Sequence, residues 1–588
     1  MHCKRMSGVR LQSPVMQDLR TPPARDGSSL PANDEPFEII WNIIRNNDSS
    51  ARANRHILNI PDTALEASQS PLATSHEARF RSEMGHISRH SAVFFAGTLF
   101  AAGAGYLFKI YLARVLGAEA LGIYALGMTV GGVLGLIAAL GLPQAAARYV
   151  AVYNGTGRYA ELKGFLWRSL AVLAVANLMV AAIMLLIRGW VAGRFYHTPA
   201  LSKYMGAFAL LMVLGSFTSF FGQALAGFKD VARRTVITNF IGSPLNVLIG
   251  VGLLMLGMGL SGYLLAQVAS ALITLVLLAL ATWKLMPPGY RSVAGELPAL
   301  QSEAIRFSAS LFAVQALEYT LAQLDKIVLG YYLDARSVGI YVVAGSVVAF
   351  LPILLQSVNQ IFSPTIADLH ARGELDLLRR LYQTLTKWIF GFTLPLAIVV
   401  CVFAAPLMQI FGREFRAGWP ILIIGTVGQL INCAVGSVGL LLIMSGHQDR
   451  LVRVQVKVVI GNIILNLALI PIWGVIGAIV VSAATNAAIN LLYLREVKAI
   501  LGLTPYNRSY VRLFLPVLGS AAIVALVRLE ASLFHNAVLA IVAGLALGYL
   551  AFIALVLLVG LDEDDRLVAG AIGSRLRGML GMMRLEAR

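Results

Sequence analysis

Long apolar segments constrain this chain more than any other feature of its sequence. A helix needs about 20 apolar residues to cross the hydrocarbon core of a membrane, and fourteen segments approach or exceed this length. Only 13% of the residues are charged, which is too few to coat the surface of a soluble chain of this size. The sequence therefore predicts an all-α integral membrane protein with fourteen transmembrane helices. The predicted spans cover residues 92–113, 121–142, 164–187, 203–225, 235–257, 261–284, 306–333, 338–363, 384–407, 419–445, 452–472, 474–494, 511–528 and 534–560.

Lys and Arg residues set the predicted orientation of these spans. Every second loop is rich in them, as in the segment that holds Lys229, Arg233 and Arg234, whereas the intervening loops hold few. Because cytoplasmic loops carry the excess of Lys and Arg, we expect both ends of the chain to be cytoplasmic. The net charge of +17 is therefore a property of inner loops and does not indicate nucleic-acid binding.

The first half of the hydrophobic region is repeated in the second half. Gly122-Ile-Tyr124 matches Gly339-Ile-Tyr341, Gly227 and Asp230 match Gly446 and Asp449, and Gly259 and Gly262 match Gly474 and Gly477, all at nearly one offset. Six predicted spans separate the copies, so both halves have the same predicted topology. Spans 13 and 14 follow the repeat.

This repeat defines the predicted domains. Residues 1–90 form a disordered cytoplasmic extension, 91–286 and 305–498 are two pseudo-symmetric six-helix bundles, 509–561 hold helices 13 and 14, and 562–588 are a cytoplasmic tail. Met84 opens a short lead into the first span, so residues 1–83 could also have no part in the function. Pro352 predicts a kink in the eighth span.

Two equivalent bundles leave a cleft between them that rocking exposes to each side of the membrane in turn. The sequence has no GxxxxGK[ST] motif for ATP, and Cys3, Cys401 and Cys433 have no metal-binding spacing. We therefore expect a transporter and not an enzyme, with no catalytic residue, metal or cofactor. A gradient of H⁺ or Na⁺ is the expected source of any coupling energy.

Ionisable residues inside a span indicate function, because they are costly to bury there. In the seventh span Ser308, Gln315, Glu318, Asp325 and Lys326 fall on one helical face, which we expect to line a wet cavity. Asp325 serves gating, coupling or substrate passage, or else contacts a basic group on a neighbouring helix. Glu318 is a candidate for coupling through protonation.

Two lysines have two interpretations each. Lys326 either lines the predicted cavity or extends its stem toward the outer interface. Lys109, in the first span, either meets an anionic headgroup in the cleft or extends outward in the same way. The amides of Asn462 and Asn466 in the eleventh span are interpreted as contacts between helices.

Two stretches carry a family resemblance. Ala113–Ala151 (ARVLGAEALGIYALGMTVGGVLGLIAALGLPQAAARYVA) and Leu324–Ala344 (LDKIVLGYYLDARSVGIYVVA) resemble the polysaccharide-transport family of Wzx-type flippases. This family belongs to the superfamily of multidrug, oligosaccharidyl-lipid and polysaccharide exporters. The resemblance covers roughly residues 90–500, and only Asp325 carries over from its recurring motif. The extension before the first span departs from the pattern.

The resemblance implies a MATE/flippase-like fold and a flippase for undecaprenyl-diphosphate-linked oligosaccharide in a bacterial inner membrane. The implied product is O-antigen or exopolysaccharide, and the implied partners are membrane lipids, a polysaccharide polymerase and a chain-length regulator. A lipid II flippase and an ion-coupled multidrug antiporter remain alternatives. A membrane glycosyltransferase or polymerase would need a larger outer loop or a catalytic domain than this sequence contains.

Overall fold

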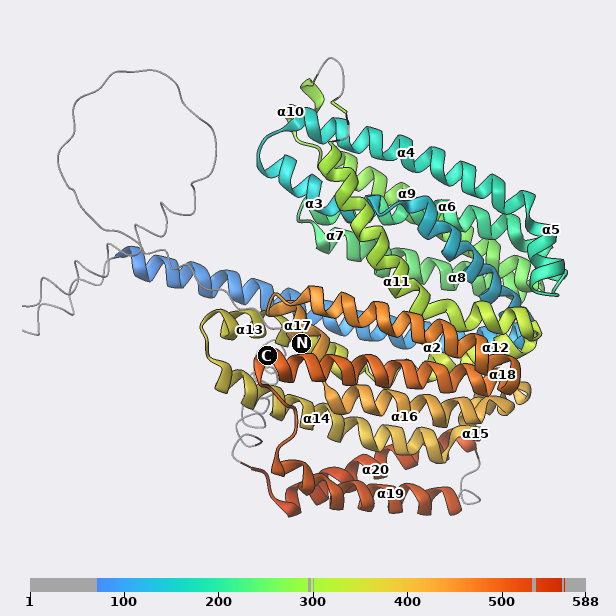
Figure 1. Ribbon diagram of the computed structural model, residues 1–588, viewed down its shortest axis with the longest axis vertical. Helices are drawn as coiled ribbons and strands as arrows, with labels where there is room; N and C mark the ends of the chain where they lie inside the picture. Colours follow the sequence, from blue (N-terminus) through green and yellow to red (C-terminus); the bar gives the residue numbers. More distant parts are fainter. Residues whose placement is uncertain (1–70, 294–297, 300, 531–535, 563–564, 566–588) are drawn as a thin grey trace, which may run out of the picture. The chain divides into compact units, whose positions relative to one another are not determined.

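The computed structural model describes residues 71–293, 298–299, 301–530, 536–562 and 565 (Figure 1). Side chains are described from Gly103 onward, apart from those of residues 104 and 361. The chain divides into a unit of residues 1–92 and a second unit of residues 93–588. Residues 1–70 of the predicted extension lie outside the described part. Residues 71–90 were predicted to be disordered, but they are helical, because Pro71 occupies a first helical position that suits proline and helix-forming residues follow.

The first bundle contains the helices before the loop that precedes α11. Its elements are α2 (Pro71–Ala139), α3 (Leu142–Gly155), α4 (Tyr159–Leu186), α5 (Arg188–Trp190), η3 (Val191–Phe195), α6 (Ala200–Gly227), α7 (Val231–Thr235), η4 (Val236–Gly242), α8 (Ser243–Met255), α9 (Gly259–Lys284) and α10 (Pro288–Ser292). Of α2, only the part from Val93 onward belongs to the unit described below.

The second bundle and the two final helices follow. Their elements are α11 (Ser302–Tyr332), α12 (Ala335–Val348), α13 (Ile353–Ala371), α14 (Leu375–Val402), α15 (Ala404–Phe411), η5 (Arg413–Gly418), α16 (Trp419–Val435), α17 (Val438–Met444), α18 (Gln448–Leu501), η6 (Arg508–Leu513), α19 (Phe514–Leu529) and α20 (Ala537–Val559). The pair α19 and α20 packs on α14.

Ten helices of the described residues are long and apolar enough to cross a membrane, or eleven if the bent pair α12 and α13 is one span. The prediction of fourteen crossings stays a prediction, since α2 and α18 each cover two predicted spans and α11 is outside this set. The kink predicted at Pro352 is confirmed, because α12 and α13 are bent by 51° across a break that contains it.

Glycines in the left-handed region break α2 and α18. Gly117 has φ 76° within α2, and Gly474 has φ 56° within α18. Only glycine adopts this conformation without a steric penalty. Gly259, the repeat equivalent of Gly474, has φ 53°. The two copies of the repeat therefore share a left-handed glycine at this position.

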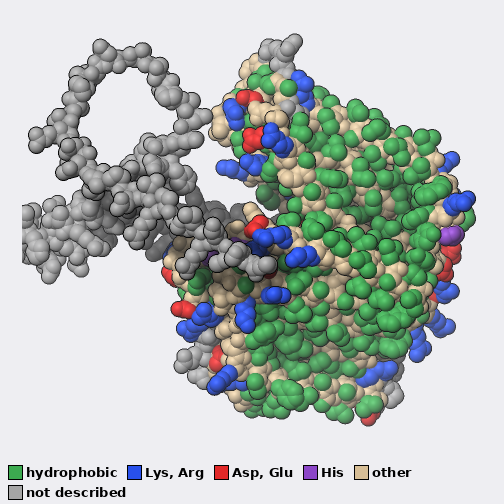
Figure 2. Space-filling view, viewed as in Figure 1, with side chains coloured by type: hydrophobic (Ala, Val, Ile, Leu, Met, Phe, Trp, Pro, Cys, Tyr) green, Lys and Arg blue, Asp and Glu red, His purple; other side chains and the backbone are tan. Residues whose placement is uncertain are grey.

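The outer surface of the helices is apolar. Figure 2 shows hydrophobic side chains over the middle of one face, with most Lys and Arg toward its two ends. Leu178 on α4, Leu248 on α8 and Leu550 on α20 are all more than 60% exposed. A soluble protein rarely exposes apolar patches of such extent, so these helices are solvated by lipid.

Helix α11 belongs to both bundles. It packs against α3 of the first bundle and against α18 of the second. Near its end, Gly330 also lies close to Leu126 and Tyr196 of the first bundle. Figure 1 shows it crossing obliquely from one group of helices to the other. This course places the polar residues of α11 between different neighbours along its length.

The start of the predicted C-terminal tail is bound to the second bundle. The Lys387 Nζ atom lies 2.8 Å from Asp562 Oδ2 and 2.6 Å from Asp565 Oδ1, and Trp388 Nε1 donates to Asp565 at 3.0 Å. Burial would raise the pKa of Asp562, but the hydrogen bonds from Lys387 and Ser509 outweigh it and hold that pKa well below its usual range. This cluster joins α14 to the segment that follows α20.

Replacing Lys387 with Met is expected to destabilise this end of the protein by about 3–5 kcal/mol, because removing one partner leaves buried carboxylates uncompensated. The midpoint of thermal unfolding in detergent measures the effect, and the exposed Lys457, changed to Met, is the control. Since the pKa of Asp562 is lowered, its contribution is present above the ordinary carboxyl pKa and is lost as the pH falls below it. Equal midpoints for the two variants would contradict a stabilising role for the cluster.

Candidate functional site

Asp325 is held by the repeat motif of the second bundle. It lies near the end of α11, and the Tyr341 hydroxyl on α12 donates a hydrogen bond to its Oδ2. The Lys326 backbone N–H donates to Asp325 Oδ1 at 2.8 Å. Asp334 caps the start of α12 by accepting from the Ser337 N–H at 3.0 Å. This tight connection turns α12 back along α11 and brings Tyr341 to the carboxylate.

The first bundle uses the equivalent tyrosine differently. Tyr124, the counterpart of Tyr341, accepts a hydrogen bond of 2.8 Å from Gln267 on α9. The same position of the repeat therefore meets a neutral amide in one bundle and a carboxylate in the other. The charge at this position belongs to the second bundle.

Asp325 lines a polar cavity of about 230 Å³ in the second bundle. It is the only charged residue among the described side chains of the wall. Asn462 Nδ2 donates to Thr485 Oγ1 at 2.9 Å, while the buried Asn462 Oδ1 has no partner in the described structure. Carboxylate, amide and hydroxyl oxygens are the ligands that hard cations prefer. The wall is formed by Leu321, Asp325, Gln429, Asn462, Ser482, Thr485, Asn486 and Ile489.

Gln315 lines a separate cavity of about 310 Å³. This cavity lies between the second half of α2, the start of α3, α6 and α11. Gln144 Nε2 donates to Gln315 Oε1 at 3.0 Å and so joins α3 to α11. One helix, α11, therefore contributes to two cavities that differ in charge.

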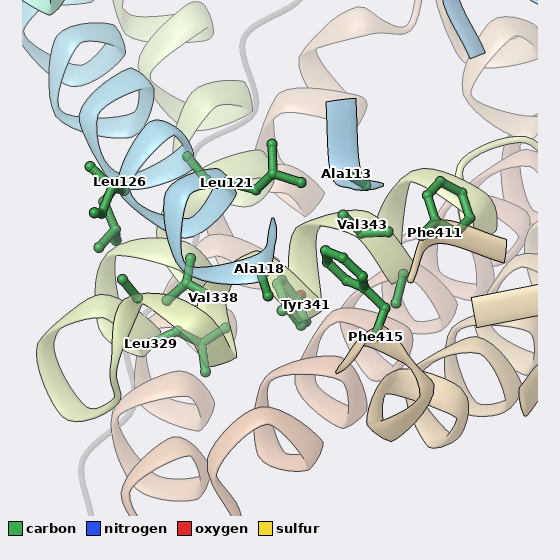
Figure 3. Packing of buried hydrophobic residues seen from close by; sticks show 14 of the residues in the cluster. Ala113, Ala118, Leu121, Leu126, Leu329, Val338, Tyr341, Val343, Phe411 and Phe415 are labelled. Atoms are coloured by element: carbon green, nitrogen blue, oxygen red, sulfur yellow. The ribbon is translucent and has the colours of Figure 1, made fainter. Parts of the chain in front are cut away.

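The two copies of the Gly-Ile-Tyr motif meet each other. A Cβ atom on Gly122 would lie 1.6 Å from the Ala335 carbonyl oxygen, and one on Gly339 would lie 1.9 Å from that of Ala118. Ala118 and Ala335 each precede their glycine by four residues, so the contact is symmetric. Figure 3 shows Ala118 packed near Val338 and Tyr341. The backbones of α2 and α12 are therefore in direct contact, at positions that the pseudo-twofold relation of the bundles makes equivalent.

Glu414 on η5 stabilises this contact between α2 and α12. Its Oε1 accepts from the Ala118 backbone N–H at 2.8 Å, and its Oε2 lies 3.6 Å from Arg336 Nε. The Ala118 N–H is available because the helix breaks at Gly117. These residues lie at the predicted outer end, where the two bundles converge.

Comparisons with known proteins agree with this geometry. A family model described as "Polysaccharide biosynthesis protein" matches residues 87–370, and one described as "MatE" matches residues 311–443. The chain is therefore similar to polysaccharide flippases over nearly half of its length. Two similar relatives come from Haloferax volcanii: the "Probable low-salt glycan biosynthesis flippase Agl15", 23% identical over 69% of this chain and 82% of its own length, and the "Probable flippase AglR", 22% identical over 72% and 86%.

Solved structures agree on the fold of this chain. The lipid II flippase MurJ in an inward closed conformation matches with a TM-score of 0.60 and 13% identity, over 79% of this chain and 97% of its own. A multidrug resistance MATE family transporter in an inward-facing conformation matches with a TM-score of 0.57 and 15% identity, over 68% and 94%. The predicted all-α, MATE/flippase-like fold is confirmed.

In the structure, the residues of the predicted polar face of α11 lie in different surroundings. Asp325 and Gln315 line different cavities, and Glu318 is exposed and lines neither. Lys326 Nζ reaches back along the helix to Ala322 O at 3.0 Å and Gln323 Oε1 at 2.7 Å. The expectation of one wet cavity along this face does not hold, because helices of the first bundle complete the cavity at Gln315 and helices of the second bundle complete the one at Asp325.

Other residues lie in surroundings that differ from those predicted for them. Lys109 is exposed and lines neither cavity. Asn462 does join helices as predicted, through Thr485, but it also lines the Asp325 cavity. Gln144, Gln429 and Thr485 were missed by sequence reasoning. Their only signal was polarity inside an apolar span, which many helix-joining residues share.

Proposed function

We propose that this chain is a transporter that flips a lipid-linked oligosaccharide across the membrane by alternating access. The observation that carries the proposal is the symmetric contact of Gly122 and Gly339 between two equivalent bundles. Small residues allow two helices to approach closely and part again without disturbing the packing inside each bundle. Opening this contact would expose the space between the bundles to the outer side.

We further propose the substrate and its direction. The relatives are named as flippases, one of them for glycan biosynthesis, which supports a lipid-linked glycan. The finer proposal is an undecaprenyl-diphosphate-linked O-antigen or exopolysaccharide unit that moves from the cytoplasmic to the outer leaflet of a bacterial inner membrane. A polymerase and a chain-length regulator would then use it. Cytoplasmic ends of the chain are part of this proposal.

The Asp325 cavity is the proposed site of the coupling cation. Its wall supplies one carboxylate and several neutral oxygens, and Asn462 Oδ1 is buried without a partner. A buried polar atom without a partner costs about 1–3 kcal/mol, which a bound cation would offset. Protonation of Asp325 or binding of Na⁺ would each remove the net charge of the cavity. Because α11 also contacts the first bundle, a change at Asp325 can reach the contact between bundles.

Depletion of the protein from its host tests the proposed function. We expect lipid-linked oligosaccharide to accumulate while surface glycan falls, since synthesis continues on the inner side without export. Mass spectrometry of extracted prenyl-diphosphate lipids measures the first, and glycan staining of whole cells the second. Re-expression of the wild-type chain is the control.

The same lipid extracts separate the alternatives. Accumulation of lipid II together with cell lysis would support the lipid II flippase instead. Unchanged levels of both lipids, with increased drug sensitivity, would support the multidrug antiporter. Either result would replace the proposed substrate.

A further inference from the structure

The cavity beside Gln315 has no described charged side chain in its wall. Five glycines, two serines, two aromatic rings and the amides of Gln144 and Gln315 contribute to it. Its volume of about 310 Å³ falls at the lower end of the range for small-molecule sites. A diphosphate would require cationic or hydrogen-bond-donating groups, and the described wall offers no Lys, Arg or His. The wall therefore suits a neutral polar ligand.

The two amides are incompletely paired. Gln144 Nε2 donates to Gln315 Oε1 at 3.0 Å, and this bond leaves Gln144 Oε1 and Gln315 Nε2 buried without a partner. One unused acceptor and one unused donor therefore lie on adjacent side chains. A sugar hydroxyl both donates and accepts a hydrogen bond, so a small turn of these amides toward the cavity would satisfy all groups. Leaving them unpaired is unfavourable in a buried site.

Glycines shape the rest of the wall. A Cβ atom on Gly127 would lie 2.0 Å from the Phe208 ring, and one on Gly132 would lie 2.0 Å from the Tyr319 hydroxyl. These glycines let both rings approach α2. The Tyr319 hydroxyl donates to the Thr129 carbonyl at 3.0 Å, which holds its ring in the wall. Aromatic walls with a few polar groups are typical of sites for amphipathic ligands.

We propose that this cavity is a neutral subsite that binds one sugar ring of the substrate through the paired amides of Gln144 and Gln315. The inference rests on the proposed function, and it deepens that function by separating glycan recognition from the charged cavity at Asp325. Both sites share α11, where Gln315 and Asp325 are about 15 Å apart along the helix axis at 1.5 Å per residue. Glycan binding and cation binding thus act on one helix.

Binding to the purified full-length chain in nanodiscs tests the subsite with two probes. One is undecaprenyl diphosphate and the other is the same lipid carrying a neutral disaccharide. We expect the wild type to bind the glycosylated probe about tenfold more tightly, as two added hydrogen bonds would provide. The double variant Gln144→Leu/Gln315→Leu should lose this preference and keep its affinity for the bare lipid. Replacing both partners by apolar groups of similar size preserves folding.

A second variant tests the space itself. Gly215 lines the cavity, and a Cβ atom there would meet nothing within 4 Å, so Gly215→Leu introduces a larger side chain into the cavity wall at an open position. We expect it to remove the preference for the glycosylated probe. Gly206 lies on the same helix, has equally open space and is outside the cavity wall, so Gly206→Leu is the matched control and should keep the preference.

Three results would overturn the proposal. Equal binding of both probes by the wild type would overturn the subsite alone, as would an equal loss of both probes in the variants. Failure of the wild type to bind even the bare lipid would overturn the proposed function, and the subsite with it. Binding of the bare lipid therefore distinguishes failure of the subsite from failure of the proposed function.

Discussion

Replacing Asp325 with Asn is expected to abolish glycan export while the protein still accumulates to normal levels. Asparagine has nearly the same shape and keeps one oxygen that can accept the hydrogen bond from Tyr341, although its amide nitrogen cannot accept from the Lys326 N–H. It cannot carry the negative charge or take up a proton at neutral pH. The change therefore removes the only charge in the described wall of the cavity and leaves the packing unchanged. Alanine at this position should also abolish export.

This prediction is tested by measuring the amounts of surface glycan and of the protein in cells whose only copy of the gene is on a plasmid. Asp334 is the matched control, because it is a carboxylate close by in sequence that caps α12. Asparagine caps helices about as well as aspartate, so Asp334→Asn should export normally. Full surface glycan in the Asp325→Asn cells would remove Asp325 from the coupling mechanism.

Replacing Gly122 with Ala is expected to reduce export more than tenfold by preventing closure at the outer end. Its Cβ atom would lie 1.6 Å from the Ala335 carbonyl oxygen, and backbone atoms cannot move aside as a flexible side chain can. The helices α2 and α12 would have to separate. Gly339→Ala should act in the same direction, since its Cβ atom would meet the Ala118 carbonyl oxygen at 1.9 Å.

An accessibility measurement separates loss of closure from loss of folding. Leu121 is buried next to this contact, so a Leu121→Cys side chain should react with a membrane-impermeant maleimide from outside only when the contact is open. We expect faster labelling when Gly122→Ala is present. Gly345→Ala, on α12 with nothing within 4 Å of its Cβ atom, is the control and should change neither labelling nor export. Slow labelling together with normal export in Gly122→Ala would contradict the role of the contact.

Much of the fold followed from local sequence. Each transmembrane helix must bury its own backbone hydrogen bonds, so apolar length locates it without knowledge of its neighbours. The breaks at Gly117 and Gly474 and the bend at Pro352 are likewise local, because these residue types restrict or free the backbone. The matched glycines of the repeat also indicated equivalent bundles before their contact was visible.

The candidate site was less predictable. Helical periodicity placed Gln315, Glu318 and Asp325 on one face of α11, but periodicity does not say which helices cover that face. Asp325 was found because a charge inside a span is costly wherever it lies. Gln144 was missed because its partner, Gln315, is 171 residues away, and an amide in a span carries no comparable penalty.

The sequence by itself therefore determined the membrane environment, the helices, the repeat and the presence of a charged residue, Asp325, within a span. Each of these depends on the cost of placing a residue in lipid or in a given backbone conformation. Only the tertiary structure decided that Gly122 and Gly339 meet, and that α11 serves two cavities of different charge. These features depend on how far apart helices pack, and that distance is set by all the side chains between them.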